Sequence, residues 1–291
     1  MTDVLKEQAA VRLLAVSPWD GVAVALGVLH GGLVVALIVA FPWLSGPVFV
    51  VLALLYAVSI AWSIHSVAHN FIHNPFFSVP ILNRAFSLLL SLTLGYSQGL
   101  SRNLHLRHHI GNSDRPNDRG ETKDPLSIYR HGRDGAAEPV LRYSVLGFFR
   151  TDLREALDLL GRTAPVELYW TWAELVLVPV VAVAVAVFYD PWAIVALLPF
   201  WFLGHVLSAL TNYYEHLGAD PKRPIAWGVS SYGRFYNWLF LNNGHHAEHH
   251  FRTRLHWSEL PALHQRLAAE QQAAGVRVLA WPHPLGFLER S

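Results

Sequence analysis

Four long apolar runs occur along the chain in two closely spaced pairs. They cover residues 22–41, 48–64, 168–188 and 192–211. Because a helix of roughly 20 apolar residues spans the hydrocarbon core of a bilayer, each run predicts a transmembrane helix. Within each pair, only a short turn containing proline separates the two runs, PWLSGP at 42–47 and YDP at 189–191. The pattern therefore predicts an all-α integral membrane protein with four transmembrane helices in two hairpins.

A fifth apolar run, at residues 81–100, is nearly long enough to span the membrane. It contains Asn83, Arg84 and Gln98, however, and histidine-rich sequences flank it on both sides. If this run crossed the bilayer, those histidine-rich sequences would lie on opposite sides of the membrane. We therefore expect a buried, re-entrant or interfacial helix here.

The remaining polar segments predict a cap on one side of the membrane. The turns at 42–47 and 189–191 contain no lysine or arginine, although the chain has 22 of these residues. By the positive-inside rule, the cap and both termini are expected to be cytoplasmic in a multi-pass protein, for example in a bacterial inner membrane. The cap is expected at residues 101–165 and 212–291, as part of a single domain over residues 1–291. Within it, Leu260, Leu263 and Leu267 form one stripe of an amphipathic helix at 258–275.

The composition supports a membrane protein and excludes several kinds of site. Hydrophobic residues make up 53% of the chain and charged residues only 15%, against about 25% charged residues in soluble domains. The net charge of +1 provides no long-range basic field for a nucleic-acid partner. Because the chain contains no cysteine, disulfides, cysteine-ligated zinc and iron–sulfur clusters are excluded.

Histidine is the unusual component, with 17 residues in the chain. Eleven fall in four clusters, HSVAHNFIH (65–73), HLRHH (105–109), NYYEH (212–216) and HHAEHH (245–250). Histidines three or four residues apart share one face of a helix, where their imidazoles can converge. One such cluster is compatible with an ordinary polar helix face, but four clusters indicate metal binding.

The number of clustered histidines indicates two metal ions. One zinc ion takes three or four ligands, so eight or nine histidines exceed the need of a single ion. Imidazole suits iron, zinc, copper and nickel, and a nitrogen-rich, thiolate-free pair beside a membrane favours iron that activates oxygen. Nearby carboxylates are candidates for orienting the imidazoles, although each is equally compatible with a solvated or capping role. They are Asp114, Asp118, Asp124, Glu215 and Glu248.

The order of the motifs resembles a known family. H-x-x-x-H, H-x-x-H-H and H-x-x-H-H, separated by paired spans, are similar to the histidine boxes of the membrane fatty acid desaturase/hydroxylase superfamily over roughly residues 48–270. The sequence NNGHHAEHHFRTRLHWSELPALH resembles the third box of desaturases, and NYYEHLG resembles a motif of membrane alkane monooxygenases. The resemblance implies a non-haem diiron centre. Its implied ligands are His65, His69, His105, His108, His109, His216, His246, His249 and His250.

Three other residues near these boxes are interpreted separately. Asn212 matches the position at which acyl-CoA desaturases hold an asparagine that binds a water on the metal, so the resemblance implies a catalytic role. His73 and His245 fall outside the spacing of the boxes. We expect them to support the ligands or to serve in packing.

The resemblance implies O2-dependent oxidation of an unactivated C–H bond in a lipid-like alkyl chain, and the third box favours fatty acyl desaturation. Hydroxylation of a fatty acid or alkane and oxidative decarboxylation to a terminal alkene are alternatives. Carotenoid-type ketolation is another, because HLRHH is followed by Asp124-Pro125. Rivals from other classes are a dizinc membrane hydrolase, which needs fewer histidines and an open water site, and a metal transporter, whose ligands would lie near mid-membrane.

The expected partners are membrane lipids, a lipid-like substrate and an external electron donor. The chain encodes no cysteine-based or haem centre of its own, so a ferredoxin, a rubredoxin or a cytochrome with its reductase must supply electrons. Basic residues near the boxes are candidates for docking an acidic donor, although most are equally expected at the headgroup level of a cytoplasmic face. They are Arg102, Arg107, Arg115, Arg119, Arg252 and Arg254.

Overall fold

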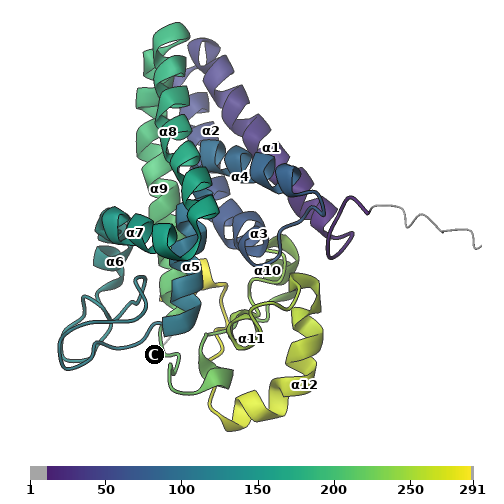
Figure 1. Ribbon diagram of the computed structural model, residues 1–291, viewed down its shortest axis with the longest axis vertical. Coiled ribbons are helices and arrows are strands. Elements are labelled where there is room, and N and C mark those ends of the chain that lie inside the picture. Colours follow the sequence, from purple (N-terminus) through teal and green to yellow (C-terminus); the bar gives the residue numbers. More distant parts are fainter. Residues whose placement is uncertain (1–11, 290–291) are drawn as a thin grey trace, which may run out of the picture.

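The computed structural model describes residues 12–289, in which every regular element is a helix (Figure 1). Four helices are long and apolar enough to cross a membrane, as predicted. They are α1 (Asp20–Ala40), α2 (Gly46–Ser63), α8 (Pro165–Phe188) and α9 (Pro191–His216). Both hairpin turns lie at the upper end of Figure 1 and the cap lies at the lower end. The termini predicted to be cytoplasmic include residues 1–11 and 290–291, which lie outside the described residues.

Two of the spanning helices are longer than their apolar runs predict. Helix α2 continues through a π-helical turn, Ile64–Ala68, into α3 (His69–His73), and α9 continues to His216. Proline stands in the first turn of α8 and of α9, where its missing N–H costs nothing. The extensions place the first histidine motif and His216 on the ends of spanning helices that lead into the cap.

Close packing joins the two hairpins. At Gly204 of α9, an added Cβ would lie 2.8 Å from the carbonyl oxygen of Ala57 and 2.7 Å from Cβ of Ile60, both on α2. Only glycine allows the two backbones to approach so closely, as at other interfaces between membrane helices. The outer faces, in contrast, expose large apolar side chains, including Val176, Val180 and Val183 of α8. Such a broad apolar surface fits contact with lipid.

The segment 81–100 does not form a helix long enough to span a membrane. It forms α4 (Pro80–Leu94), whose 15 residues reach only about 22 Å, and then the start of α5 (Gln98–Gly111). Figure 1 shows α4 running crosswise to α1 and α2. One stripe of α4, Phe86, Leu90 and Leu94, is buried, and Gly95 ends the helix with a φ of 74°. The chain thus turns back, and the second histidine motif on α5 lies on the same side as the first.

A buried carboxylate in the third span fixes the start of α5. Glu174 accepts hydrogen bonds from the Ser97 hydroxyl (2.7 Å), the backbone N–H of Gly99 (2.8 Å) and the Ser87 hydroxyl (2.5 Å). A carboxylate is favourable at the N-terminus of a helix, where free N–H groups and the helix dipole attract negative charge. The polar residue in α8 therefore positions the helix that carries the second histidine motif.

Short helices and loops build the cap. Its α-helices are α6 (Val140–Leu146), α7 (Leu153–Thr163), α10 (Arg234–Leu239), α11 (His246–Phe251) and α12 (Leu260–Ala273). Short 3₁₀ segments occur in the cap at Gly147–Arg150, Pro224–Ala226, Trp257–Glu259 and His283–Leu288, and another, Phe41–Trp43, lies in the first hairpin turn. The amphipathic helix predicted at 258–275 is confirmed as α12, with Leu260 and Leu263 buried.

The C-terminal part of the cap is tied to the first span. The buried carboxylate of Asp20, the first residue of α1, accepts hydrogen bonds from Nε2 of His256 (2.9 Å) and Nε1 of Trp257 (3.3 Å). These two residues follow α11 in the tail of the third histidine motif. The motif is thereby held against the membrane end of α1.

Candidate metal centre

Five imidazoles converge at the first of two histidine groups. Nε2 of His73 lies 2.8 Å from Nε2 of His105 and 3.0 Å from Nε2 of His109. Nε2 of His249 lies 2.9 Å from Nε2 of His69 and 3.1 Å from Nε2 of His109. We call these five residues the first histidine group. They come from α3, α5 and α11, and so unite three of the four sequence clusters.

Four buried imidazoles form the second histidine group. Nε2 of His216 lies 2.9 Å from Nε2 of His108 and 3.0 Å from Nε2 of His246. One ring nitrogen from each of these residues and from His250 lies within 4.8 Å of all the others. The two groups are neighbours, because the rings of His109 and His250 have centroids only 4.2 Å apart.

Each of the two H-x-x-H-H motifs contributes histidines to both groups. In the motif on α5, His105 and His109 belong to the first group and His108 to the second. In the motif on α11 the division is reversed, since His249 belongs to the first group and His246 and His250 to the second. Residues four apart share a helix face, whereas adjacent residues point about 100° apart. Each motif therefore spans two neighbouring sites.

The donor set fits two metal ions. A contact of about 3 Å between two ring nitrogens requires a proton between them, and a neutral imidazole has only one N–H to offer. In His250 that N–H, at Nδ1, donates to Oδ1 of Asn112 (2.7 Å), which leaves the buried Nε2 without a partner. Burial lowers the pKa of His105, His109 and His250 well below its usual range, so their lone pairs stay free at neutral pH. A cation in each group would satisfy these nitrogens.

Asp124 orients one ligand of the second group. Its Oδ2 accepts a hydrogen bond of 2.6 Å from Nδ1 of His108, which turns Nε2 toward His216. The same carboxylate accepts from the backbone N–H groups of Ser113 and Leu126, each at 2.7 Å. Gly111 makes room for this loop, because a Cβ there would lie 2.5 Å from the backbone nitrogen of Asp124. This is the carboxylate–histidine arrangement that supports metal ligands in many proteins.

We expect the Asp124→Ala variant to hold the second metal roughly 10- to 100-fold more weakly, the usual effect of removing such a carboxylate. The measurement is metal retention against increasing chelator in detergent-purified protein. Asp118→Ala is the matched control, since Asp118 is exposed on the same loop. Equal retention by both variants would contradict a role for Asp124 in holding His108.

Eight of the nine predicted ligands lie in the two groups, and His65 does not. Nε2 of His65 faces the carbonyl and hydroxyl oxygens of Ser208 at 3.0 and 3.1 Å, and its Nδ1 lies 3.3 Å from Glu215. His73, expected to be a supporting or packing residue, occupies the first group instead. The π-helical turn Ile64–Ala68 is the physical reason. A π-helix turns through a smaller angle per residue than an α-helix, so the side chain of His65 points away from the face that His69 and His73 share.

The other predicted polar residues have different surroundings. Glu215 accepts a hydrogen bond from Nδ2 of Asn243 (2.7 Å) and lies 4.0 Å from Nε2 of His246. Asp114 accepts from the backbone N–H of Asp124 (3.0 Å), and so shapes the loop rather than an imidazole. Asn212, the predicted catalytic residue, donates through Nδ2 to the Tyr143 hydroxyl (2.7 Å).

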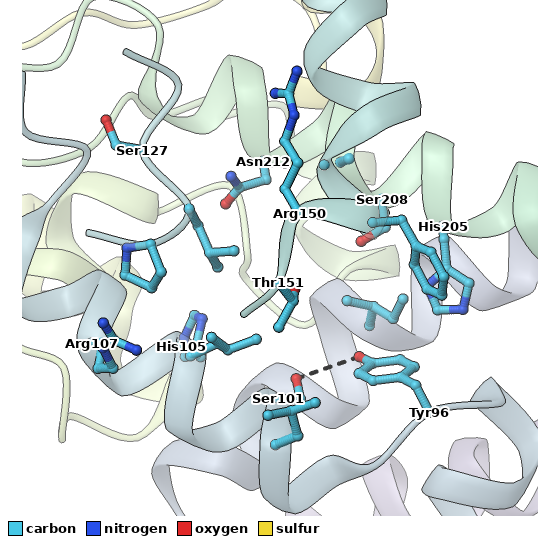
Figure 2. Close-up of a pocket in the computed structure, with 18 of the residues that line it drawn as sticks. Tyr96, Ser101, His105, Arg107, Ser127, Arg150, Thr151, His205, Ser208 and Asn212 are labelled. Carbon is cyan, nitrogen blue, oxygen red and sulfur yellow. Dashed lines mark hydrogen bonds between the residues drawn. The ribbon is translucent and has the colours of Figure 1, made fainter. Parts of the chain in front are cut away.

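A cavity of about 340 Å³ reaches the histidine groups from the side of α5, α6 and α9 (Figure 2). This volume lies in the range of small-molecule sites, roughly 300–1,000 Å³. Its wall includes His69 and His105 of the first group, His246 of the second, and Asn212. Much of the remaining wall is apolar, with Ile64, Ala68, Leu100, Leu104, Phe148 and Ala209.

Charged side chains also line the cavity. Arg107 and Arg150 lie there, and both are paired with carboxylates, Glu155 at 2.6 Å and Glu138 at 2.6 Å. Figure 2 shows Arg107 and Asn212 on the opposite side of the view from Tyr96 and His205, with Arg150 between them. The cavity wall thus combines apolar and polar side chains, and the polar ones include Ser127 from the loop that carries Asp124. Sequence reasoning did not identify Tyr143, because no motif marks a tyrosine that meets Asn212 only in the folded chain.

Together these features define a class of membrane protein, one whose spanning helices carry two histidine groups suited to two metal ions beside an apolar cavity. A family model described as fatty acid desaturase matches residues 45–281. The chain belongs to the fatty acid desaturase family, as the histidine motifs indicated. Comparison with curated proteins and with solved structures gave no match.

Proposed function

We propose that the protein is a diiron oxidoreductase that desaturates a fatty acyl chain with O2. The observation that carries this proposal is the apolar cavity, whose wall includes His69 and His105 of the first histidine group and His246 of the second. The balanced reaction converts –CH2–CH2– to –CH=CH–. Together with two electrons and two protons supplied from outside, it reduces one O2 to two waters. The histidine groups and the family support oxidation, and the third box supports desaturation in particular.

The proposed ligand set differs from the sequence expectation at one position. His69, His73, His105, His109 and His249 would hold one iron, and His108, His216, His246 and His250 would hold the other. When bound, the two irons supply the redox chemistry that no side chain of this protein provides. Asp124 and Asn112 keep His108 and His250 in the orientation that presents Nε2.

The chain's own residues position the substrate. Ile64, Ala68 and Leu104 line the cavity beside the histidines, where they exclude water and hold an alkyl chain in one orientation. Asn212 lies on the same wall, and its bond to Tyr143 fixes the direction of its amide. We assign Asn212 the role of orienting water or substrate next to the second group.

The proposal also includes the source of the electrons and the side of the membrane on which the donor binds. A groove directly after the third histidine motif is lined by Arg252, Arg254 and Arg266 together with Leu263 and Leu267. Exposed arginines around a small apolar floor suit an acidic electron-transfer protein. The absence of basic residues from both hairpin turns supports a cytoplasmic position for this groove.

The test is product analysis with iron-loaded protein. Detergent-purified protein is first analysed for iron and zinc, and about two irons per chain are expected from the two groups. It is then supplied with a reduced ferredoxin system, O2 and bacterial lipid extract, and the acyl chains are analysed by gas chromatography with mass detection. New double bonds support desaturation, and an alcohol from the same chains would assign hydroxylation instead. Zinc alone in protein from iron-rich medium would contradict the oxidative reaction and favour a hydrolase.

A further inference from the structure

A third cluster of metal-binding side chains lies outside both histidine groups. His245 directly precedes α11, Glu248 lies within it, and His264 projects from α12. One ligand atom of each residue lies within 4.8 Å of the other two. We propose that this third cluster is a mononuclear metal site of the zinc type, which fastens the third histidine motif to α12.

The charge at the cluster favours a cation. The Glu248 side chain is fully buried, and within residues 12–289 its only ionic neighbours are His245 and His264. A buried carboxylate is costly unless it is paired or coordinates a metal. The hydroxyls of Tyr232 and Ser230 donate to it at 2.8 and 3.0 Å, but they bring no positive charge.

The separations of the ligand atoms lie near those around a tetrahedral ion. Bonds of about 2.0–2.1 Å to zinc place neighbouring ligand atoms about 3.3 Å apart. Nδ1 of His264 lies 2.7 Å from one oxygen of Glu248, and Nδ1 of His245 lies 3.9 Å from the other. These two separations bracket the required value, so small rotations of the side chains would complete the site.

The ring nitrogen Nδ1 of His245 is an independent indication that this cluster binds an ion. Its side chain is 9% exposed, and its Nδ1 has no hydrogen-bond partner. A buried ring nitrogen without a partner is unfavourable, and this one faces the carboxylate of Glu248. His264 is 27% exposed, so an ion has a path from solvent. Two histidines and one carboxylate, with a further position open to water, form an established zinc ligand set.

The site has a structural consequence for the rest of the chain. Helix α11 is only six residues long, yet it carries His246, His249 and His250 for the two histidine groups. An ion held jointly by α11 and α12 would stiffen this short helix. The ring of His264 also packs on Tyr232, with centroids 3.9 Å apart, which restrains the ligand from α12.

The test compares zinc content in wild-type protein and the His264→Gln variant. Full-length protein is purified in detergent, exposed to equimolar zinc, dialysed, and analysed for zinc and iron in the same sample. We expect about one zinc per chain in the wild type and at least a tenfold loss of zinc in the variant, with iron unchanged. His131→Gln is the control, because this exposed histidine belongs to none of the three clusters. It should retain zinc at the wild-type level.

A second measurement does not depend on the folding of any variant. Iron-loaded wild-type protein is titrated with Co²⁺, and tetrahedral Co²⁺ gives strong visible absorption that Zn²⁺ should remove. Absence of this absorption, or equal zinc content in wild type and His264→Gln, would overturn the proposal and leave Glu248 and His264 as a hydrogen-bonded pair. Because iron is measured separately, failure here is distinguishable from failure of the diiron proposal.

Discussion

Replacing His73 with alanine is expected to remove one of the two irons and abolish oxidation, whereas replacing His65 with alanine should leave both irons in place. Nε2 of His73 lies 2.8 and 3.0 Å from Nε2 of His105 and His109, inside the first histidine group. The imidazole of His65 is instead directed at Ser208 and Glu215. Loss of one imidazole from a shared site should lower the iron content from about two to about one per chain.

The two variants control for each other. Both remove an imidazole from the continuous helix Gly46–His73, so a general effect on the span would appear in both. Iron content and thermal unfolding should be measured on the same preparations. The His65→Ala variant is expected to lose some thermal stability, because Glu215 loses a buried partner at 3.3 Å. If His65→Ala lost an iron and His73→Ala kept both, the ligand set proposed here would be replaced by the one that the sequence motif implied.

The difference between these two ligand sets shows what the sequence could and could not specify. Residues 65–73 contain two overlapping H-x-x-x-H motifs, which share His69. On a regular α-helix all three histidines would lie near one face, so spacing alone does not select between the motifs. The π-helical turn Ile64–Ala68 makes the selection. Such a turn depends on packing around it, here against α1 and, through His65, against Ser208 and Glu215 of α9, and no local pattern of residues indicates it.

The spans and the division into hairpins, in contrast, follow from local sequence. A run of about 20 apolar residues in a bilayer has few alternatives to a helix, because every backbone polar group must be satisfied within the segment. The observed ends differ from the predicted ones mainly where polar histidine motifs extend α2 and α9 into the cap. Hydropathy has no signal there, since these ends pack against protein rather than lipid.

Contacts between distant segments were the least predictable part of the site. Asp124 was one of five carboxylates that the sequence offered equally as candidates for orienting an imidazole. Only the folded chain brings it to His108, across the turn at Asn112 and Ser113. Glu248 was a candidate for orienting an imidazole of the boxes, and its partners are His264 and His245. Glu248 and His264 lie on different helices, so the i, i+3 and i, i+4 spacings within one helix could not predict their contact.

Filling the cavity should stop turnover without removing metal. Ala209 of α9 lines the cavity, between Ser208 and Asn212 in the sequence. In the Ala209→Phe variant the added ring would occupy space needed by an alkyl chain. An overpacking cost of about 2–3 kcal/mol on the bound chain corresponds to a roughly 30- to 150-fold loss in kcat/KM. The measurement is double-bond formation in acyl chains, with iron content determined in parallel.

The matched control places the same ring on the outer face of the bundle. Val183 of α8 is 60% exposed on the apolar surface that fits lipid contact, so Val183→Phe should keep both iron and activity. Because Ala209 belongs to neither histidine group, iron in the Ala209→Phe variant should also stay near the wild-type level. Full activity of Ala209→Phe would mean that the alkyl chain reaches the histidines by another path. Loss of activity together with iron would show that the ring disturbs the metal groups rather than the substrate. Only loss of activity at constant iron content connects this cavity to the reaction, since it separates the binding of the chain from the assembly of the metal centre.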